Sequence, residues 1–161
     1  LIDQNARRAA ATLDSVRVFQ PDGRAAAQLE EWKKSLEAGG VSLRAALAEH
    51  YRLLTGVSEL PTSQLSSEEK RMAGKVPEVA ASVAEYIEKR NALRVSSRLH
   101  GLMRYEVWNF VDGRRSYLDI YRAVRAEAQA VGEWYYGSVA PKQVEELLDS
   151  GVKAGFLRLK R

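Results

Sequence analysis

The sequence from Leu102 to Arg161 reads LMRYEVWNFVDGRRSYLDIYRAVRAEAQAVGEWYYGSVAPKQVEELLDSGVKAGFLRLKR, and it decides the fold. Polar and glycine-containing breaks divide this region into a helix, a turn, a second helix, an aromatic loop, a third helix and a closing strand. This order of elements is the outline of a winged-helix unit. The alternative is a three-helix packing unit that contributes only stability.

A turn at Asp112-Gly113 separates the first two helices of this region. Gly113 can adopt the left-handed conformation that ends a helix without steric cost. Ser116 is suited to cap the next helix, and Asp119 three residues later completes a variant of the capping box. An apolar face follows at helical spacing. Its members are Tyr117, Ile120, Tyr121, Val124 and Ala128.

The last helix is expected to begin near Pro141, because proline is favoured at the first helical position. Gly155 is expected to end it, and a short strand with apolar and basic residues closes the chain. The apolar positions of this helix and strand are Val144, Leu147, Leu148, Val152, Phe156, Leu157 and Leu159. The fold class predicted is all-α, with a helical bundle followed by a winged-helix-like three-helix unit and a short terminal β-wing.

Short amphipathic helices are predicted upstream of this region. Glycine pairs, prolines and capping residues place these helices at residues 2–18, 25–38, 43–54, 66–74, from Pro77 onward, and 91–111 as one long or two joined helices. Leu29, Trp32 and Leu36 form the expected buried face of the second helix, which Gly39-Gly40 should end. Residues 55–63 are the best linker, but we place the domains at 1–90, a helical connector, and 91–161, the winged-helix-like domain.

Composition restricts the class of protein. The chain has 161 residues, 45% hydrophobic and 29% charged, which is typical of a globular chain. It has no apolar run of membrane-spanning length, and the lack of cysteine excludes disulfides and cysteine-bound metal. Residues 1–90 hold 13 basic and 13 acidic side chains, whereas residues 91–161 hold 12 basic and 8 acidic and carry the whole net charge of +4. Leu1 is not a methionine and no signal-peptide pattern follows, so we expect a piece of a longer chain.

Catalytic chemistry has no candidate residues in this sequence. The only histidines are His50 and His100, far apart, and zinc needs three or four converging ligands. Paired glutamates such as Glu145-Glu146 lie beside basic residues, as on an ordinary solvated helix. No serine or threonine has a neighbouring histidine to activate it. We therefore expect no catalytic residue, no metal and no cofactor in this chain.

The sequence argues against nucleic acid as a partner, although a winged-helix outline suggests one. A recognition helix enters the major groove of DNA, where phosphate charge favours basic side chains. The last helix has more acidic than basic residues, with Glu145, Glu146 and Asp149 against Lys142 and Lys153. The basic residues lie elsewhere, so a protein partner is the more favoured hypothesis.

The aromatic loop Trp134-Tyr135-Tyr136 has two interpretations. Tryptophan and tyrosine dominate the hot spots of protein interfaces, so the loop could bind a partner. The favoured interpretation is that it fills the gap between two helices, with part of it facing a partner. The candidate partner contacts are Trp134, Tyr135, Tyr136, Arg114 and Arg115.

The last third of the chain resembles the carboxy-terminal segment of bacterial M28 peptidases, the zinc aminopeptidase-like group. Those tails carry an N-x-x-D-G-x-R-S-hydrophobic-x-x-I motif and end on A-G-hydrophobic. The matching residues are Asn109, Asp112, Gly113, Arg115, Ser116, Ile120, Ala154 and Gly155. A similar D-G-x-x-S pattern occurs in small winged-helix peptide-binding modules similar to PqqD, so the motif marks a structural unit more than an activity.

The resemblance implies a non-catalytic accessory domain. An M28 peptidase binds two zinc ions on an α/β catalytic domain, and no residue here matches one of its ligands. The expected role is to pack on that catalytic domain or another chain, or to build an oligomer, in an exported or periplasmic protein. The alternatives are a winged-helix regulator that binds nucleic acid and a module that binds a peptide or protein.

Overall fold

The chain forms two compact units. A computed structural model describes residues 2–16, 19, 22–61, 64–94 and 98–160. The first unit is Leu1–Ser63 and the second is Gln64–Arg161. The division falls at the end of the segment that the sequence marks as a linker, residues 55–63.

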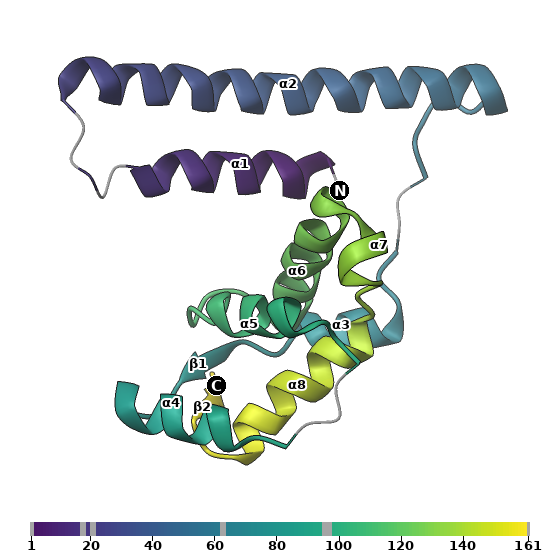
Figure 1. Cartoon of the computed structure of the whole chain (residues 1–161). Coiled ribbons are helices and arrows are strands. Elements are labelled where there is room, and N and C mark those ends of the chain that lie inside the picture. The colour runs from purple at the N-terminus through teal and green to yellow at the C-terminus, as the bar shows by residue number, and fades with distance from the viewer. Residues whose placement is uncertain (1, 17–18, 20–21, 62–63, 95–97, 161) are drawn as a thin grey trace. The chain divides into compact units, whose positions relative to one another are not determined.

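The first unit is a helical hairpin of α1 (Ile2–Val16) and α2 (Gly23–Thr55), which run side by side (Figure 1). The expected end of the first helix, at Val18, lies outside the described residues. The carboxylate of Asp14 pairs with Lys33 at 2.8 Å, and Asp3 at the other end of α1 pairs with Arg44. Asp14, late in α1, pairs with the earlier of the two α2 residues, and Asp3, early in α1, pairs with the later one, so α1 and α2 are antiparallel.

The prediction that Gly39-Gly40 ends a helix is wrong, since α2 continues for 33 residues from Gly23 to Thr55. A helical glycine costs about 1 kcal/mol relative to alanine. Packing of α2 along α1 offsets this cost, and Gly40 faces α1 at a position where a Cβ would touch the Cβ of Ala6 at 3.4 Å. Gly56, with φ +72°, ends the helix instead.

The predicted buried face of α2 is largely exposed. Leu29 is buried, but Trp32 is 53% exposed and Leu36 is also exposed. The physical reason is that a hairpin gives each helix a single neighbour, which covers only a narrow stripe of its surface.

The second unit contains the remaining elements. These are α3 (Ser67–Ala73), β1 (Pro77–Val79), α4 (Val83–Ala92), α5 (Gly101–Asn109), α6 (Tyr117–Val131), α7 (Glu133–Tyr136), α8 (Pro141–Lys153) and β2 (Leu157–Leu159). The predicted class, all-α with a short β-wing, is confirmed. The predicted order of elements is confirmed as well, except that the expected aromatic loop forms the short helix α7 (Figure 1). The expected helix at 91–111 is wrong in its first half, because α4 ends at Ala92 and α5 begins at Gly101; residues 95–97 lie outside the described residues.

The wing is formed by two strands distant in sequence. β1 and β2 pair antiparallel, with Pro77 opposite Leu159 and Val79 opposite Leu157. The prediction that Pro77 begins a helix is therefore wrong. Proline lacks a backbone N–H and fits the first residue of an edge strand. The helix begins at Val83, after Ser82 and the capping box that Ser82 forms with Glu85.

The core of the second unit is built on α6. The amide N–H of Asp119 donates to the Ser116 hydroxyl at 3.2 Å, and the Asp119 carboxylate accepts from the amide N–H of Ser116 at 3.1 Å. This confirms the predicted cap. The predicted apolar face of α6 is buried throughout, and it packs with residues of α3, α5, α8 and β2. Gly113 has the expected positive φ, +71°.

The compact units do not divide after Arg90, where we expected the domain boundary. β1 and α4 lie in the second unit, because β1 pairs with the terminal strand β2. On α4, Tyr86 makes an edge-on contact with the buried ring of Phe156, with 5.3 Å between ring centroids. These contacts make residues 64–90 part of the winged unit.

Candidate protein-interaction surface

The aromatic segment predicted from the sequence forms α7, a single helical turn. Gly132 before it has φ +122° and Gly137 after it has φ +71°, so the chain turns out of α6 and back toward α8 through two left-handed glycines. A side chain at Gly132 would collide with the Trp134 indole. Glycine adopts positive φ angles readily, so Gly132 and Gly137 suit the two turns that flank α7.

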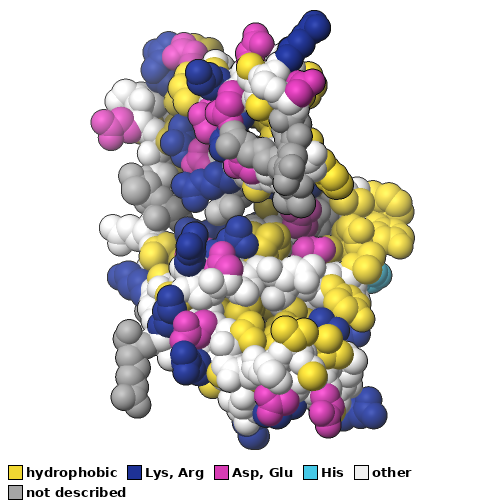
Figure 2. All heavy atoms as spheres, turned by 90° about the vertical axis from the view of Figure 1, so that its left-hand side faces the viewer, with side chains coloured by type: hydrophobic (Ala, Val, Ile, Leu, Met, Phe, Trp, Pro, Cys, Tyr) yellow, Lys and Arg dark blue, Asp and Glu magenta, His cyan; other side chains and the backbone are white. Residues whose placement is uncertain are grey.

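Four aromatic rings meet at α7. Trp134 contacts Tyr135 at 5.6 Å between centroids, and Tyr135 contacts Tyr136 at 4.8 Å. His100 lies against Tyr135 at 5.5 Å and against Tyr136 at 5.2 Å. We call Trp134, Tyr135, Tyr136 and His100 the aromatic surface. In the space-filling view, hydrophobic side chains form a protruding patch beside a histidine (Figure 2).

Exposure separates the two interpretations of this segment. Tyr136 is half-buried and packs against the core, as expected of a residue that fills a gap. Trp134 is 85% exposed and Tyr135 is 52% exposed. The gap-filling interpretation therefore holds for Tyr136 alone, and the other two rings face solvent.

His100 has a structural reason to lie there. It is the N-cap of α5, and its Nδ1 accepts a hydrogen bond from the amide N–H of Leu102 at 3.3 Å. The cap fixes the imidazole on the tyrosines of α7. His50 is exposed on α2 in the first unit.

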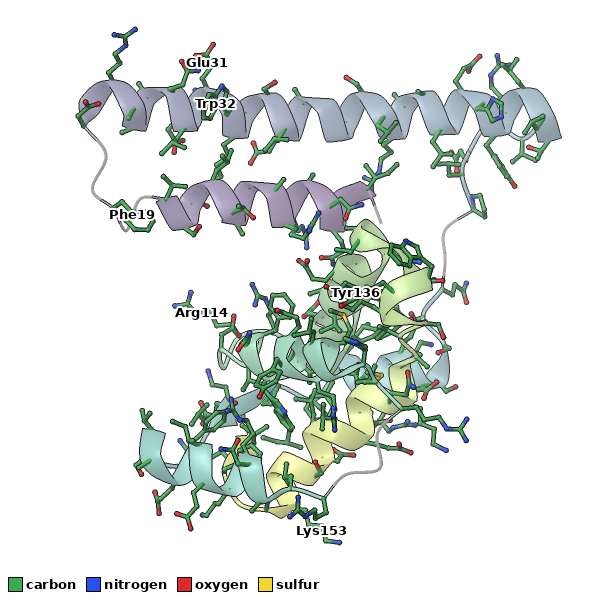
Figure 3. The ribbon with its side chains drawn as sticks, viewed as in Figure 1. Phe19, Glu31, Trp32, Arg114, Tyr136 and Lys153 are labelled. Carbon is green, nitrogen blue, oxygen red and sulfur yellow. The ribbon has the colours of Figure 1, made fainter. Side chains whose placement is uncertain are left out.

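The structure does not bring Arg114 and Arg115 to the aromatic surface. They lie in the turn before α6, where Asp112 Oδ1 accepts hydrogen bonds from both of their amide N–H groups, at 2.8 and 2.9 Å. α7 follows the other end of α6, whose 15 residues span about 22 Å. Figure 3 shows Arg114 well apart from Tyr136. The Arg115 guanidinium lies over the Phe110 ring at 4.9 Å, whereas the Arg114 side chain is exposed.

The most perturbed carboxylate in the described part of the chain is Glu145, on α8. It is only 8% exposed, which corrects our interpretation of Glu145-Glu146 as a surface pair. Arg71 donates two hydrogen bonds to its oxygens, at 3.0 and 2.7 Å, and Lys75 donates a third at 3.0 Å. The hydrogen bonds from Arg71, the largest cause, and from Lys75 lower the pKa of the Glu145 carboxyl to about 2. Glu145 thus ties α8 to α3 and has a structural role.

Neither a metal site nor a membrane span is found within the described residues. In that part of the chain, no three or more His, Asp or Glu side chains are grouped so that they could hold a metal ion. No described helix is both long and apolar enough to cross a membrane.

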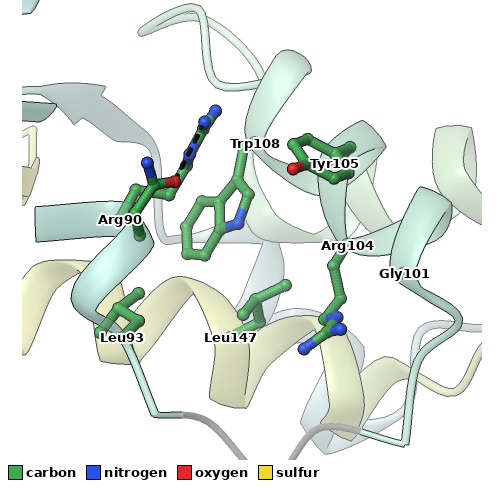
Figure 4. Close-up of a pocket in the computed structure, with 8 residues that line it drawn as sticks. Arg90, Leu93, Gly101, Arg104, Tyr105, Trp108 and Leu147 are labelled. Carbon is green, nitrogen blue, oxygen red and sulfur yellow. Dashed lines mark hydrogen bonds between the residues drawn. The ribbon is translucent and has the colours of Figure 1, made fainter. Parts of the chain in front are cut away.

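A pocket that the sequence analysis missed lies between α4, α5 and α8 (Figure 4). It has a volume of about 210 Å³. Its lining residues are Arg90, Asn91, Leu93, Gly101, Arg104, Tyr105, Trp108 and Leu147. Two signals could have found it: the i, i+3, i+4, i+7 spacing of the four α5 residues, and the run of residues 89–104, which has five basic and no acidic side chains.

Comparison with known proteins identifies no relative of this chain. No protein-family model matches the chain, and neither curated proteins nor solved structures give a match. The resemblance to M28 peptidases therefore rests on the sequence motif between Asn109 and Gly155.

Proposed function

We propose that the chain is a non-catalytic module that binds a protein partner through the aromatic surface of its second unit. The observation that carries this proposal is the exposure of Trp134 and Tyr135 on α7, the single helical turn between Gly132 and Gly137. Exposed tryptophan has a cost in water that burial against a partner removes, and such residues are enriched among interface hot spots.

The partner proposed is an M28-type zinc catalytic domain in the same polypeptide. This choice is supported by the motif at Asn109 to Ser116 and by nothing else in the molecule. This choice of partner predicts what the gene encodes upstream of Leu1. The coding sequence upstream of Leu1 should encode several hundred residues with the zinc-ligand spacing of an α/β peptidase, and a start codon close to Leu1 would contradict this choice of partner.

A binding experiment tests the role of the aromatic surface. The upstream domain and the present chain are produced separately, and their affinity is measured by titration calorimetry. Trp134→Ala should weaken binding by about 2 kcal/mol, the threshold of a hot spot, or roughly thirtyfold. Trp32→Ala is the matched control, because Trp32 is also an exposed tryptophan but lies on α2 in the first unit. Equal affinities for the two variants would refute the proposal.

A further inference from the structure

One face of α2 carries apolar side chains along the whole length of the helix. At about 100° per residue, these side chains fall within about 60° of the helix circumference, a sector that contains no charged residue. Its members, which we call the α2 stripe, are Ala25, Leu29, Trp32, Leu36, Leu43, Leu47, His50 and Leu54. The histidine is the one polar member of the stripe.

The helical hairpin leaves most of the α2 stripe uncovered. Leu29 is buried, but the other large apolar members are exposed, up to 73% at Leu54. Arg44 pairs with Asp3 near the start of α1, so residues 45–55 of α2 extend past α1 (Figure 1). The 33 residues of α2 span about 50 Å. An exposed apolar face of this extent marks an interaction surface.

The α2 stripe is symmetric about the pair Gly39-Gly40. Leu36 lies as far before this pair as Leu43 lies after it, and the same holds for Trp32 and Leu47. The two outer pairs are Leu29 with His50 and Ala25 with Leu54. Across a two-fold axis, residue i of one copy contacts residue j of the other, and j contacts i. An antiparallel pair of α2 helices centred on the glycines therefore sets one stripe against the other along its whole length.

The symmetry is specific to antiparallel pairing. A parallel pair would set each residue against its own copy, with two Trp32 indoles at the same level. The antiparallel pair instead places Trp32 opposite the smaller side chain of Leu47 in the second copy. Large side chains opposite smaller ones interdigitate better than two large ones at one level.

Gly39 lies at the centre of this symmetry and has open space beside it. In the described part of the chain, a Cβ at Gly39 would meet nothing within 4 Å, so no intrachain contact requires glycine there. Glycine destabilises the middle of a helix relative to alanine, but it allows a second backbone to approach closely. The close approach of two α2 helices at this point accounts for the residue.

The α2 stripe is large enough for a specific interface. A contact strip about 50 Å long and about 10 Å wide, the diameter of a helix, covers about 500 Å² on each copy. Two copies then bury about 1,000 Å², the size at which specific interfaces begin. Because the sector contains no charged residue, this pairing buries no unpaired charge.

We propose that two copies of the chain associate through the α2 stripe, antiparallel across a two-fold axis at Gly39-Gly40, so that their two hairpins form a four-helix bundle. The partner is a second copy of this chain because the stripe complements itself in this register. The α2 stripe belongs to the first unit and the aromatic surface to the second, and the proposal does not depend on the function proposed above.

Sedimentation equilibrium of the whole 161-residue chain tests the association. The parent should have a Kd on the order of 10 μM and be mostly dimeric at about 100 μM. Its mass should then approach about 36 kDa, twice the 18.0 kDa of one chain. Leu36→Glu places a carboxylate opposite Leu43 at two symmetric positions and should weaken the dimer more than about a hundredfold.

Val41→Glu is the matched control. Val41 is exposed on the same helix but lies outside the α2 stripe, so this variant should weaken the dimer less than about twofold. An unchanged circular dichroism spectrum shows that each variant keeps its helices.

The two exposed tryptophans separate this proposal from the function proposed above. Trp32→Ala should weaken the dimer by about tenfold or more and leave the affinity for the upstream domain unchanged. Trp134→Ala should have the opposite effects, because Trp134 lies on the second unit.

Cysteine crosslinking tests the orientation of the pair. The chain has no cysteine, so an introduced cysteine is unique. A disulfide needs Cα atoms within about 7 Å, and in the antiparallel pair residue 36 is offset from its own copy by about 10 Å along the helix. Leu36→Cys and Leu43→Cys should therefore not crosslink alone, whereas an equimolar mixture of the two should form disulfide-linked heterodimers.

The outcomes decide the proposal. A dimer that Leu36→Glu dissociates and Val41→Glu does not, with crosslinking in the cysteine mixture, supports it. A parent mass of one copy or of more than two would overturn it, as would an equal loss in Val41→Glu. Crosslinking of each cysteine variant with itself, or no crosslinking in the mixture, would overturn it as well.

Discussion

Replacing Glu145 with glutamine should destabilise the second unit in a pH-dependent manner. The pKa of the Glu145 carboxyl is lowered from 4.5 to about 2 by its hydrogen bonds to Arg71 and Lys75. Each pKa unit corresponds to 1.36 kcal/mol, which gives about 3 kcal/mol in total. Arg71 is half exposed and solvent screens its charge, so we expect a loss of about 2 kcal/mol near pH 7 in Glu145→Gln.

The sign of the pH dependence follows from the lowered pKa. A carboxyl whose pKa is lower in the folded state contributes its full stabilisation above its unfolded pKa, near 4.5, and loses it as the pH falls toward about 2. The unfolding free energies of the parent and of Glu145→Gln should therefore differ most near neutral pH and converge near pH 2.

The assay is urea unfolding followed through the NMR signal of Trp108, which lies in the second unit. Glu146→Gln is the matched control, because Glu146 neighbours Glu145 on α8 but is exposed and pairs with Lys142 only at 3.8 Å. Its effect should stay within about 0.5 kcal/mol at every pH. A Glu145→Gln difference that is independent of pH, or equal to that of the control, would refute the reasoning.

Three other outcomes are expected. Changing Gly113 to valine and Ser116 to alanine together should lower the melting temperature by several degrees, since a positive φ costs a Cβ-bearing residue about 1 kcal/mol and a lost cap about 0.5–2 kcal/mol. Arg114→Ala should change the melting temperature little. If thermal unfolding shows instead that Arg114→Ala melts early and the double variant melts with the parent, the turn is not structural. DNA binding should be weak and collapse between about 50 and 200 mM salt in a filter or fluorescence assay, whereas sequence-specific nanomolar affinity at physiological salt would contradict the account. Elemental analysis should find far less than one zinc per purified chain, and a stoichiometric content would contradict the absence of a ligand set.

Local signals in the sequence were sufficient for α6 and α8. Ser116 and Asp119 mark a cap within four residues, and Pro141 marks the start of α8, so no distant contact was needed to place either helix. The apolar faces that follow have the helical period and are buried against each other. The same local reasoning located the positive φ of Gly113.

Long-range contacts could not be predicted in this way. The local sequence at Pro77 predicts the start of a helix. In the structure Pro77 pairs instead with Leu159, at the far end of the chain, and no local signal indicates that pairing. The pair Gly39-Gly40 predicted a helix end, because the packing against α1 that supports a continuous α2 is a tertiary contact. The local sequence predicts that Glu145 is solvated, because its partner Arg71 is 74 residues away and cannot be identified from the neighbouring residues.

The candidate site was predicted in part. Aromatic composition identified Trp134 and Tyr135, but exposure distinguishes them from Tyr136, and exposure depends on the packing of α5 and α6. The arginines at 114 and 115 were grouped with them by charge and chemistry, yet the length of α6 separates the two positions. The pocket at Trp108 was not predicted. The spacing of its α5 residues and the basic run at 89–104 mark part of its lining, but the arrangement of the three helices that enclose it depends on tertiary packing.

Hydrogen exchange tests the central claim most directly. The exchange of the backbone amides of residues 133–137 is measured in this chain alone and in the protein with its upstream domain attached. The account predicts that a partner seated on Trp134 and Tyr135 slows exchange there by about tenfold or more, while the amides near Trp32 on α2 are unchanged. Identical exchange at residues 133–137 in the two proteins would contradict the claim that the aromatic surface is an interface.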